Sequence, residues 1–176
     1  FIEDRKLTFL SAFNDPWIVA GQGTIGLELY EQNPDLDVVV VPVGGGGLTA
    51  AMALVFKTLL TKVRIVGVQS AAVPSMKTAL EKGAPAQLPA ATTIADGIAV
   101  RAVGATPFEL VKNYVDEIVT VSEGEIANAV LMLLEIEKTV AEGAAAVPLA
   151  ALLNKKISVA GKNVGLVVSG GNIDMN

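Results

Sequence analysis

Short apolar runs alternate with longer stretches of mixed or small residues along this chain. Three of the runs are almost continuously apolar, at Val38–Val43, Val63–Val68 and Asn163–Val168. Runs of this kind are typical of parallel strands that are buried on both faces. Glu117–Val121 ("EIVTV") is predicted as a further strand.

The stretches around these strands have the length and composition of helices. They are predicted at Trp17–Tyr30, Leu48–Leu60, Pro74–Lys82, Pro107–Asn113, Ile126–Val140 and Ala144–Leu153. Two helix starts carry clear signals: Asn14-Asp15-Pro16 places a proline at the first helical position, and Ser122-Glu123-Gly124-Glu125 is a capping box. The order of strands and helices predicts an α/β fold, an open and mostly parallel sheet with helices on both faces.

Composition excludes several classes of protein. Of the 176 residues, 52% are hydrophobic and 18% are charged, so the chain can bury a core. The net charge of −5 is scattered along the chain, which argues against a nucleic-acid partner. No apolar run approaches the roughly 18 residues that a membrane helix needs, and no secretory signal opens the chain, so we expect a cytoplasmic protein.

Two residue types are missing altogether. Without cysteine there can be no disulfide and no thiolate metal site, and without histidine the usual general base is lacking. Catalysis by this chain would therefore depend on chemical groups that come from elsewhere, such as a bound cofactor. The chain begins at Phe1 rather than Met, which suggests a processed, trimmed or fragmentary chain.

Four consecutive glycines, Gly44, Gly45, Gly46 and Gly47, separate a predicted buried strand from a predicted helix that starts at Leu48. Glycine lets the backbone come close to an anion, and the helix dipole adds positive potential at this place. A tight turn without a ligand would need only one or two glycines. The surplus therefore predicts a phosphate site, although not a Walker A loop, since no Gly-Lys-Ser/Thr follows.

A second glycine motif, Gly21-Gln22-Gly23-Thr24-Ile25-Gly26, fits the G-x-G-x-x-G pattern of dinucleotide-binding folds. Such folds need a strand directly before the motif, and here only a short stretch separates it from the Asn14-Asp15-Pro16 turn. Packing of a helix through small residues is the favoured interpretation, and a nucleotide site stays open as the alternative.

Two further segments could carry chemistry. Thr92–Gly97 ("TTIADG") is either a plain turn or a loop that places a carboxylate and open backbone beside a ligand. Ser169-Gly170-Gly171-Asn172 follows the last predicted strand. In open α/β sheets ligands bind beyond the carboxyl ends of the strands, so Ser169 and the run of glycines at 44–47 are expected to face one crevice.

Taken in order, "VPVGGGGL", "TIADG" and "VSGGN" resemble the tryptophan synthase β-like (fold-type II) pyridoxal-phosphate enzymes, and among them the threonine dehydratases, or threonine ammonia-lyases, with serine racemase as close kin. "DPWIVAGQGTIGLEL" and "VAEGAAAV" extend the resemblance over nearly the whole chain. The resemblance implies pyridoxal 5'-phosphate (PLP) as the cofactor. It implies these cofactor-binding residues: Gly44, Gly45, Gly46, Gly47 and Leu48 around the phosphate, Gly97 (beside Asp96) and Glu142 near the ring, and Ser169 on the pyridine nitrogen.

The same resemblance shows what this chain lacks. The family's cofactor-bonding lysine lies in a Ser-Phe-Lys-x-Arg segment that does not occur here, and Lys57, Lys112 and Lys138 have the contexts of ordinary solvated charges. We therefore expect residues 1–176 to be the C-terminal part of the catalytic domain, with no catalytic residue of its own, the lysine upstream of Phe1 and no regulatory domain. Gln69 and Ser75 replace the acidic residues of the racemase cation site, so no metal is expected there.

The implied reaction is the dehydration and deamination of L-threonine or L-serine to 2-oxobutanoate or pyruvate and ammonia. A lysine outside this stretch would remove the α-proton, and the cofactor phosphate would protonate the leaving hydroxyl. Rival interpretations are a racemase of the same family, an NAD-type oxidoreductase built on Gly21–Gly26, and a non-catalytic cofactor-binding module. Whether the role is threonine catabolism or isoleucine biosynthesis stays open.

The last expectation concerns assembly. Leu131–Leu134 and Ile136 make the predicted helix Ile126–Val140 apolar over much of its circumference, which predicts that it is buried. A domain without its N-terminal half would also expose apolar surface. Together with the resemblance, this predicts a homodimer or homotetramer.

Overall fold

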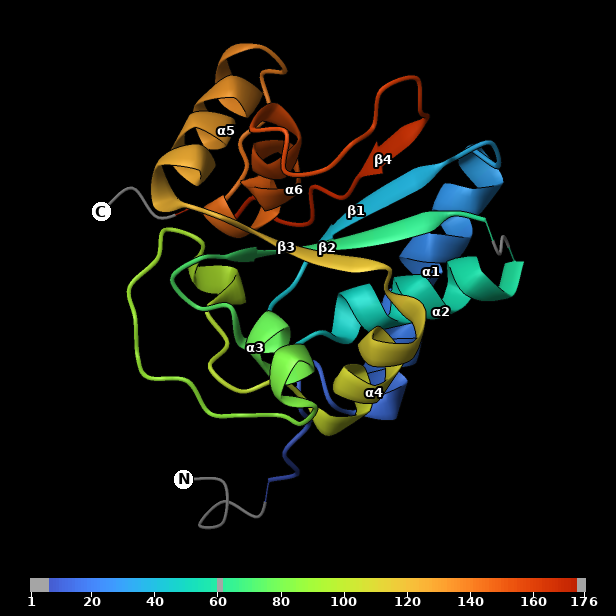
Figure 1. Ribbon diagram of the computed structural model, residues 1–176, viewed down its shortest axis with the longest axis vertical. Coiled ribbons are helices and arrows are strands. Elements are labelled where there is room, and N and C mark those ends of the chain that lie inside the picture. Colours follow the sequence, from blue (N-terminus) through green and yellow to red (C-terminus); the bar gives the residue numbers. More distant parts are fainter. Residues whose placement is uncertain (1–6, 60–61, 174–176) are drawn as a thin grey trace.

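A sheet of four parallel strands forms the centre of the fold, in the order β3-β2-β1-β4 (Figure 1). The computed structural model describes residues 7–59 and 62–173. The strands are β1 (Val38–Pro42), β2 (Arg64–Ser70), β3 (Glu117–Val121) and β4 (Val164–Leu166). All four lie where the sequence predicts them, and the predicted parallel arrangement is confirmed.

Helices cover both faces of this sheet, as predicted (Figure 1). One face carries α1 (Pro16–Gln32), α2 (Gly47–Leu59), α3 (Ser75–Lys82) and α4 (Ala105–Tyr114), and the other carries α5 (Glu123–Glu135) and α6 (Gly143–Leu153). A short 3-10 helix, η1 (Asp96–Ile98), interrupts the long connection from α3 to α4. The predicted end of the second helix at Leu60 lies outside the described residues.

The continuous apolar pattern of β1 follows from this sandwich. Val38 and Val40 belong to the core cluster that packs under α5 and α6, whereas Val39 and Val41 belong to the cluster formed with α2. Every residue of β1 is buried. Since alternate side chains point to opposite faces of a strand, a strand covered on both sides must be apolar at each position.

The start of α5 agrees with the sequence, but its end does not. The capping box is present, with the Ser122 hydroxyl accepting from Glu125 N–H and the Glu125 carboxylate accepting from Ser122 N–H. The helix stops at Glu135 rather than Val140, because Lys138 adopts a left-handed backbone (φ 55°) and the chain turns back so that Thr139 N–H donates to Leu133 C=O (3.0 Å).

The prediction that this helix is buried as a whole is wrong for the described chain. Only Ile126, Ala129 and Leu133 are buried, on the side that faces α6. Leu131 and Leu134 are 60% and 50% exposed. One stripe of the helix therefore belongs to the core, and the remaining apolar side chains lie on the surface.

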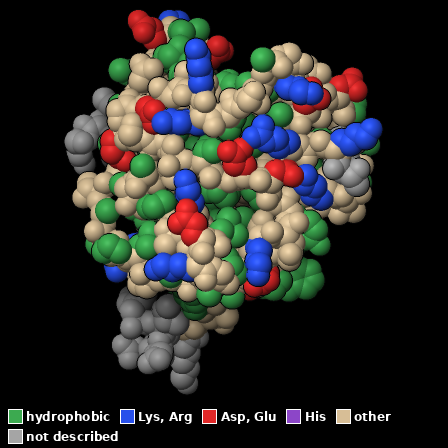
Figure 2. All heavy atoms as spheres, viewed as in Figure 1, with side chains coloured by type: hydrophobic (Ala, Val, Ile, Leu, Met, Phe, Trp, Pro, Cys, Tyr) green, Lys and Arg blue, Asp and Glu red, His purple; other side chains and the backbone are tan. Residues whose placement is uncertain are grey.

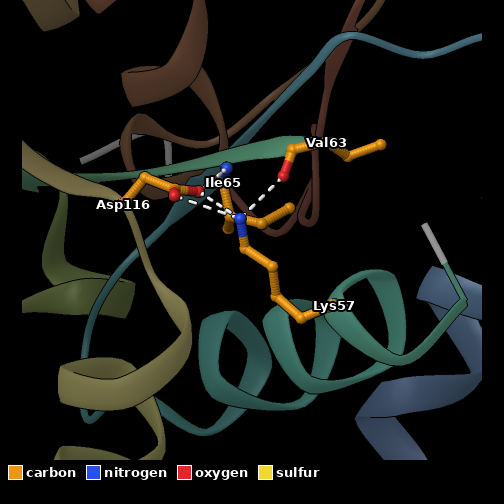
Figure 3. Close-up of polar contacts among 4 residues, drawn as sticks. All are labelled: Lys57, Val63, Ile65 and Asp116. Carbon is orange, nitrogen blue, oxygen red and sulfur yellow. Dashed lines mark hydrogen bonds and ion pairs between the residues drawn. The ribbon is translucent and has the colours of Figure 1, made fainter. Parts of the chain in front are cut away.

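An ion pair joins three elements at the amino ends of the strands (Figure 3). The Lys57 ammonium of α2 donates to both Asp116 carboxylate oxygens (3.0 and 2.8 Å) and to the Val63 carbonyl (2.9 Å). The same carboxylate accepts from Ile65 N–H (2.7 Å). Lys57 is thus a structural cation that ties α2 to the starts of β2 and β3, and the expectation of a solvated charge is wrong for it.

The surface seen in Figure 2 carries basic and acidic side chains intermixed, so this face has no patch of a single sign. Within the described residues, no helix has the length and apolarity to cross a membrane.

Candidate functional site

The glycine run lies at the carboxyl end of β1 and leads directly into α2. Gly45, Gly46 and Gly47 are buried, yet no hydrogen bond from the backbone N–H groups of residues 44–48 reaches another residue in the described part of the chain. A buried N–H without a partner costs about 1–3 kcal/mol, so several in succession at a helix N-terminus form a place for an anion. The predicted phosphate loop thus has suitable geometry.

Packing provides a second reason for these glycines. A Cβ atom on Gly45 would overlap the ring of Phe13, and one on Gly44 would lie 3.1 Å from Ile98 Cα. Gly46 combines a positive φ (97°) with the close approach of Met76, and a Cβ on Gly47 would lie 2.9 Å from the Phe13 carbonyl oxygen. Each glycine is therefore needed for packing, and the surplus of glycines does not by itself indicate a ligand. The unpaired N–H groups carry that argument.

Phe13 is a member of this site that the sequence pattern did not reveal. Its backbone and its ring both lie against the glycine loop. The next residue, Asn14, accepts from Thr106 N–H at the start of α4 (3.1 Å), and Asp15 caps α1 by accepting from Trp17 N–H (2.9 Å). The predicted turn before α1 therefore holds Phe13 on the loop. No local periodicity could have signalled this contact.

Glu142 contacts two other segments that the sequence predicts as parts of the site, Thr92–Gly97 and Ser169–Asn172. A Cβ on Gly97 would lie 3.0 Å from a Glu142 carboxylate oxygen, and a Cβ on Gly170 would overlap the same carboxylate. The Glu142 N–H donates to the Gly170 carbonyl (3.2 Å). Although Glu142 is the N-cap residue of α6, its side chain makes no capping hydrogen bond. The carboxylate thus lies between two segments that are 73 residues apart in sequence.

A cavity of about 570 Å³ opens beside this carboxylate. Its walls include Thr93, Asp96, Glu142, Gly143, Asn172 and the α5 residue Leu131. The predicted residues Gly44–Gly47, Leu48, Gly97 and Ser169 do not line it, and Ser169 is exposed next to Gly170. The link between the cavity and the glycine loop is the loop before α4, in which Ile98 packs on Gly44.

The G-x-G-x-x-G motif has no part in this site. Gly21–Gly26 lies inside α1, and no strand precedes it within the described residues. Cβ atoms on Gly23 and Gly26 would lie 3.4 and 3.2 Å from Val55 of α2. The motif is a contact between two helices, and the dinucleotide hypothesis is wrong because these glycines form no strand-to-helix turn.

Gln69 of β2 holds the residue that precedes the glycine loop. Its buried amide donates to the carbonyl of Val43 (3.2 Å), the residue before the loop, and to the Ser75 hydroxyl (3.4 Å). The amide oxygen accepts from Lys77 N–H (3.0 Å). Both ends of Gln69 are thus bonded to protein groups without charge. That no cation binds here stays a prediction.

Known proteins are similar to this chain over nearly its whole length. The sequence profile of a family described as "Pyridoxal-phosphate dependent enzyme" matches residues 1–170. An L-threonine ammonia-lyase of Thermotoga maritima is 54% identical over 99% of this chain and 43% of its own length, and one of Geobacter sulfurreducens is 49% identical over 98% and 43%. The chain therefore spans less than half the length of these relatives.

Solved structures give the same result. A threonine deaminase from T.th. superposes with a TM-score of 0.91 at 36% identity, over 99% of this chain and 65% of that one. Maize serine racemase superposes with a TM-score of 0.92 at 33% identity, over 99% of this chain and 54% of that one. Both the predicted fold and the predicted family are confirmed. This chain belongs to the pyridoxal-phosphate dependent enzyme family.

Proposed function

We propose that this protein catalyses the PLP-dependent dehydration and deamination of L-threonine or L-serine to 2-oxobutanoate or pyruvate and ammonia. The observation that carries the proposal is the row of N–H groups at residues 44–48, which bond to no other described residue and of which three belong to the buried glycines Gly45–Gly47, in a chain whose curated relatives are named for threonine dehydration. These relatives are longer than this chain, so we assign the activity to the complete protein.

The phosphate group of the cofactor would be held by the glycine loop. The N–H groups of residues 44–48 would bind this one anion, and the dipole of α2 adds positive potential at its N-terminus. Phe13 would close the side of the loop that its ring covers. When bound, PLP withdraws electrons from the α-carbon of an amino acid and makes its α-hydrogen acidic.

The other contacts of the cofactor would come from the group around Glu142. In this proposal the Ser169 hydroxyl meets the pyridine nitrogen, and a neutral hydroxyl leaves that nitrogen without a proton, which favours elimination over wider carbanion chemistry. Gly97 and Gly170 leave room for the Glu142 carboxylate at the edge of the ring.

The lysine that bonds to the cofactor is proposed to lie outside residues 1–176. Lys57 is held by Asp116, and the Lys112 ammonium lies 5.8 Å from the centre of the Phe108 ring. Lys138 donates to the Glu135 carbonyl. None of these three residues lines the cavity beside Glu142. This chain would supply the C-terminal part of the catalytic domain.

The direct test uses the complete protein, purified with and without PLP. We expect L-threonine to yield 2-oxobutanoate and ammonia in equal amounts, only when PLP is present. Conversion of L-serine to D-serine without release of a 2-oxo acid would show a racemase instead. A protein that takes up no PLP, measured by the loss of free cofactor on gel filtration, would overturn the proposal.

A cytoplasmic location and a homo-oligomeric assembly, a dimer or a dimer of dimers, belong to the same proposal. The exposed apolar side chains of α5, such as Leu131, are the feature that favours association. Sedimentation of the complete protein at micromolar concentration tests the assembly, and a monomer would contradict it without affecting the cofactor assignment.

A further inference from the structure

The segment from Thr93 to Ile98 touches both parts of the candidate site. At its end, Ile98 packs on Gly44 of the glycine loop, with 3.1 Å between Ile98 Cα and a Cβ placed on the glycine. One residue earlier, Gly97 lies against the Glu142 carboxylate. The segment therefore lies between the phosphate loop and Glu142 and contacts both.

Regular structure does little to hold the segment in place. Between the end of α3 at Lys82 and the start of η1 at Asp96, the chain forms neither helix nor strand. Backbone groups in such a connection have no helix or strand partners and must find their hydrogen bonds elsewhere, for instance in side chains.

Glu123, in the first turn of α5, provides that bond. One of its carboxylate oxygens accepts from the hydroxyls of Thr93 (2.7 Å) and Ser70 (2.9 Å), and the other accepts from Ile94 N–H (2.7 Å). Thr93 and Ser70 are buried, and Ser70 is the last residue of β2. The carboxylate thus joins the segment to the sheet and to α5 at once.

The carboxylate is held in its charged form. Burial raises the pKa of Glu123. The hydrogen bonds from Ile94, Thr93 and Ser70 lower it by more than burial raises it, so that the pKa lies below its ordinary value. Hydrogen bonds to a charged acceptor are about twice as strong as those between neutral groups.

We infer that Glu123 is a positioning residue for the cofactor site: its carboxylate fixes Thr93 and Ile94 so that Gly97 lies against Glu142 and Ile98 against the phosphate loop. In the described part of the chain, the hydrogen bonds of the Glu123 carboxylate go to Ser70, Thr93 and Ile94 and to none of the proposed cofactor-binding residues. The inference rests on the proposed function only in that the ligand of the site is PLP.

The chain contains a matched control. Glu125 lies in the same first turn of α5, and its carboxylate also accepts a backbone N–H, that of Ser122 (2.7 Å), and pairs with Lys156 (2.9 Å). Glu123→Gln and Glu125→Gln each remove one negative charge from the start of one helix. Only Glu123→Gln disturbs the Thr93–Ile98 segment, because its amide places N–H donors against the donors that the carboxylate binds.

The experiment compares the two variants in the complete protein by PLP titration and by hydrogen exchange of the Ile94 amide. For Glu123→Gln we expect the dissociation constant of PLP to rise about tenfold or more and exchange at Ile94 to accelerate. For Glu125→Gln both should stay within about twofold, even if the variant melts earlier. Thr93→Val removes the hydroxyl that donates to Glu123 and accepts from Ala95 N–H, but it keeps the shape of the side chain and leaves the bond from Ile94 N–H to Glu123 in place. It should give a smaller change in the same direction and serves if Glu123→Gln fails to fold.

Equal PLP affinity and equal Ile94 exchange in Glu123→Gln and the unaltered protein would overturn the inference. So would losses of affinity in both glutamine variants that simply follow their melting temperatures. If the unaltered protein binds PLP but does not convert L-threonine, the proposed reaction fails while the titration still decides the role of Glu123. If it binds no PLP, both fail.

Discussion

The carboxylate of Glu142 lies directly against the backbone of Gly170, and a hydrogen bond of 3.2 Å from the Glu142 N–H to the Gly170 carbonyl joins the same two residues. The start of α6 and the segment after β4 are thereby held at the carboxyl end of the sheet. Open α/β sheets bind their ligands at this end. Ser169, which is exposed, directly precedes Gly170 in the sequence.

Gly170→Ala should displace the Glu142 carboxylate, because the added methyl group would overlap it. We expect the affinity of the complete protein for PLP to fall about tenfold, equivalent to about 1.4 kcal/mol, with little change in melting temperature. Gly124→Ala is the control, since a Cβ there meets no other atom within 4 Å. It should leave the affinity unchanged and stabilise α5 by less than the roughly 0.5–1 kcal/mol of a mid-helix exchange, because Gly124 lies in the first turn. Equal affinity in the two variants would contradict the prediction.

Gly45→Asp should abolish binding of PLP, for two reasons that can be separated. The side chain would overlap Phe13, and its charge would face the phosphate. Gly45→Ala introduces the overlap alone, so combining it with Phe13→Ala should recover part of the PLP affinity. Gly45→Asp should stay defective in the Phe13→Ala background. Fluorescence titration with PLP measures each case, and recovery of the Asp variant would show that charge plays no part.

Gly26→Val should weaken the fold without changing the cofactor site. Its side chain would press on Val55 of α2, since a Cβ already lies 3.2 Å away. Overpacking of this kind costs about 1–3 kcal/mol, to be measured by urea unfolding. PLP affinity should stay within about twofold of the unaltered value, because the helix contact is remote from the phosphate loop. A loss of PLP affinity much larger than twofold would contradict the prediction.

Asp116→Ala should destabilise the protein more than Lys57→Met. Removing the carboxylate leaves both the Lys57 ammonium and the Ile65 N–H without this acceptor, whereas Lys57→Met keeps the apolar stem and leaves the bond from Ile65 in place. We expect a loss of about 1–3 kcal/mol for Asp116→Ala and about 1 kcal/mol or less for Lys57→Met in urea unfolding. The reverse order would mean that the ion pair, rather than the bond to Ile65, dominates.

Lowering the pH should remove the contribution of the Glu123 carboxylate to the free energy of unfolding. Its pKa in the folded protein lies below the ordinary value of 4.5. The contribution is therefore fully present above that value and is lost as the pH falls through the folded pKa. The difference in unfolding free energy between the unaltered protein and Glu123→Gln should be constant from pH 7 to pH 6 and shrink on acidification. A difference independent of pH down to 3 would show that the carboxylate is not held in its charged form.

Local patterns in the sequence determined the elements. Val38–Val41 had to be a strand covered on both faces because each of its residues is apolar, and Ser122 with Glu125 marked the start of α5 because capping depends on residues three apart. The end of α5 was missed because no proline or glycine marks it. The helix ends at Glu135, and the chain then turns at Lys138 through a left-handed residue that is not glycine.

Only the local part of the site could be predicted from the sequence. The glycine run at Gly44–Gly47 lies within one short segment, so its turn from strand to helix could be predicted from neighbouring residues alone. Contacts between distant segments could not: Phe13 on Gly45, Glu123 on Thr93 and Glu142 on Gly170. Such pairs have no periodicity and no fixed spacing, so only the parallel sheet, which gathers the carboxyl ends of its strands, determines which of these side chains meet.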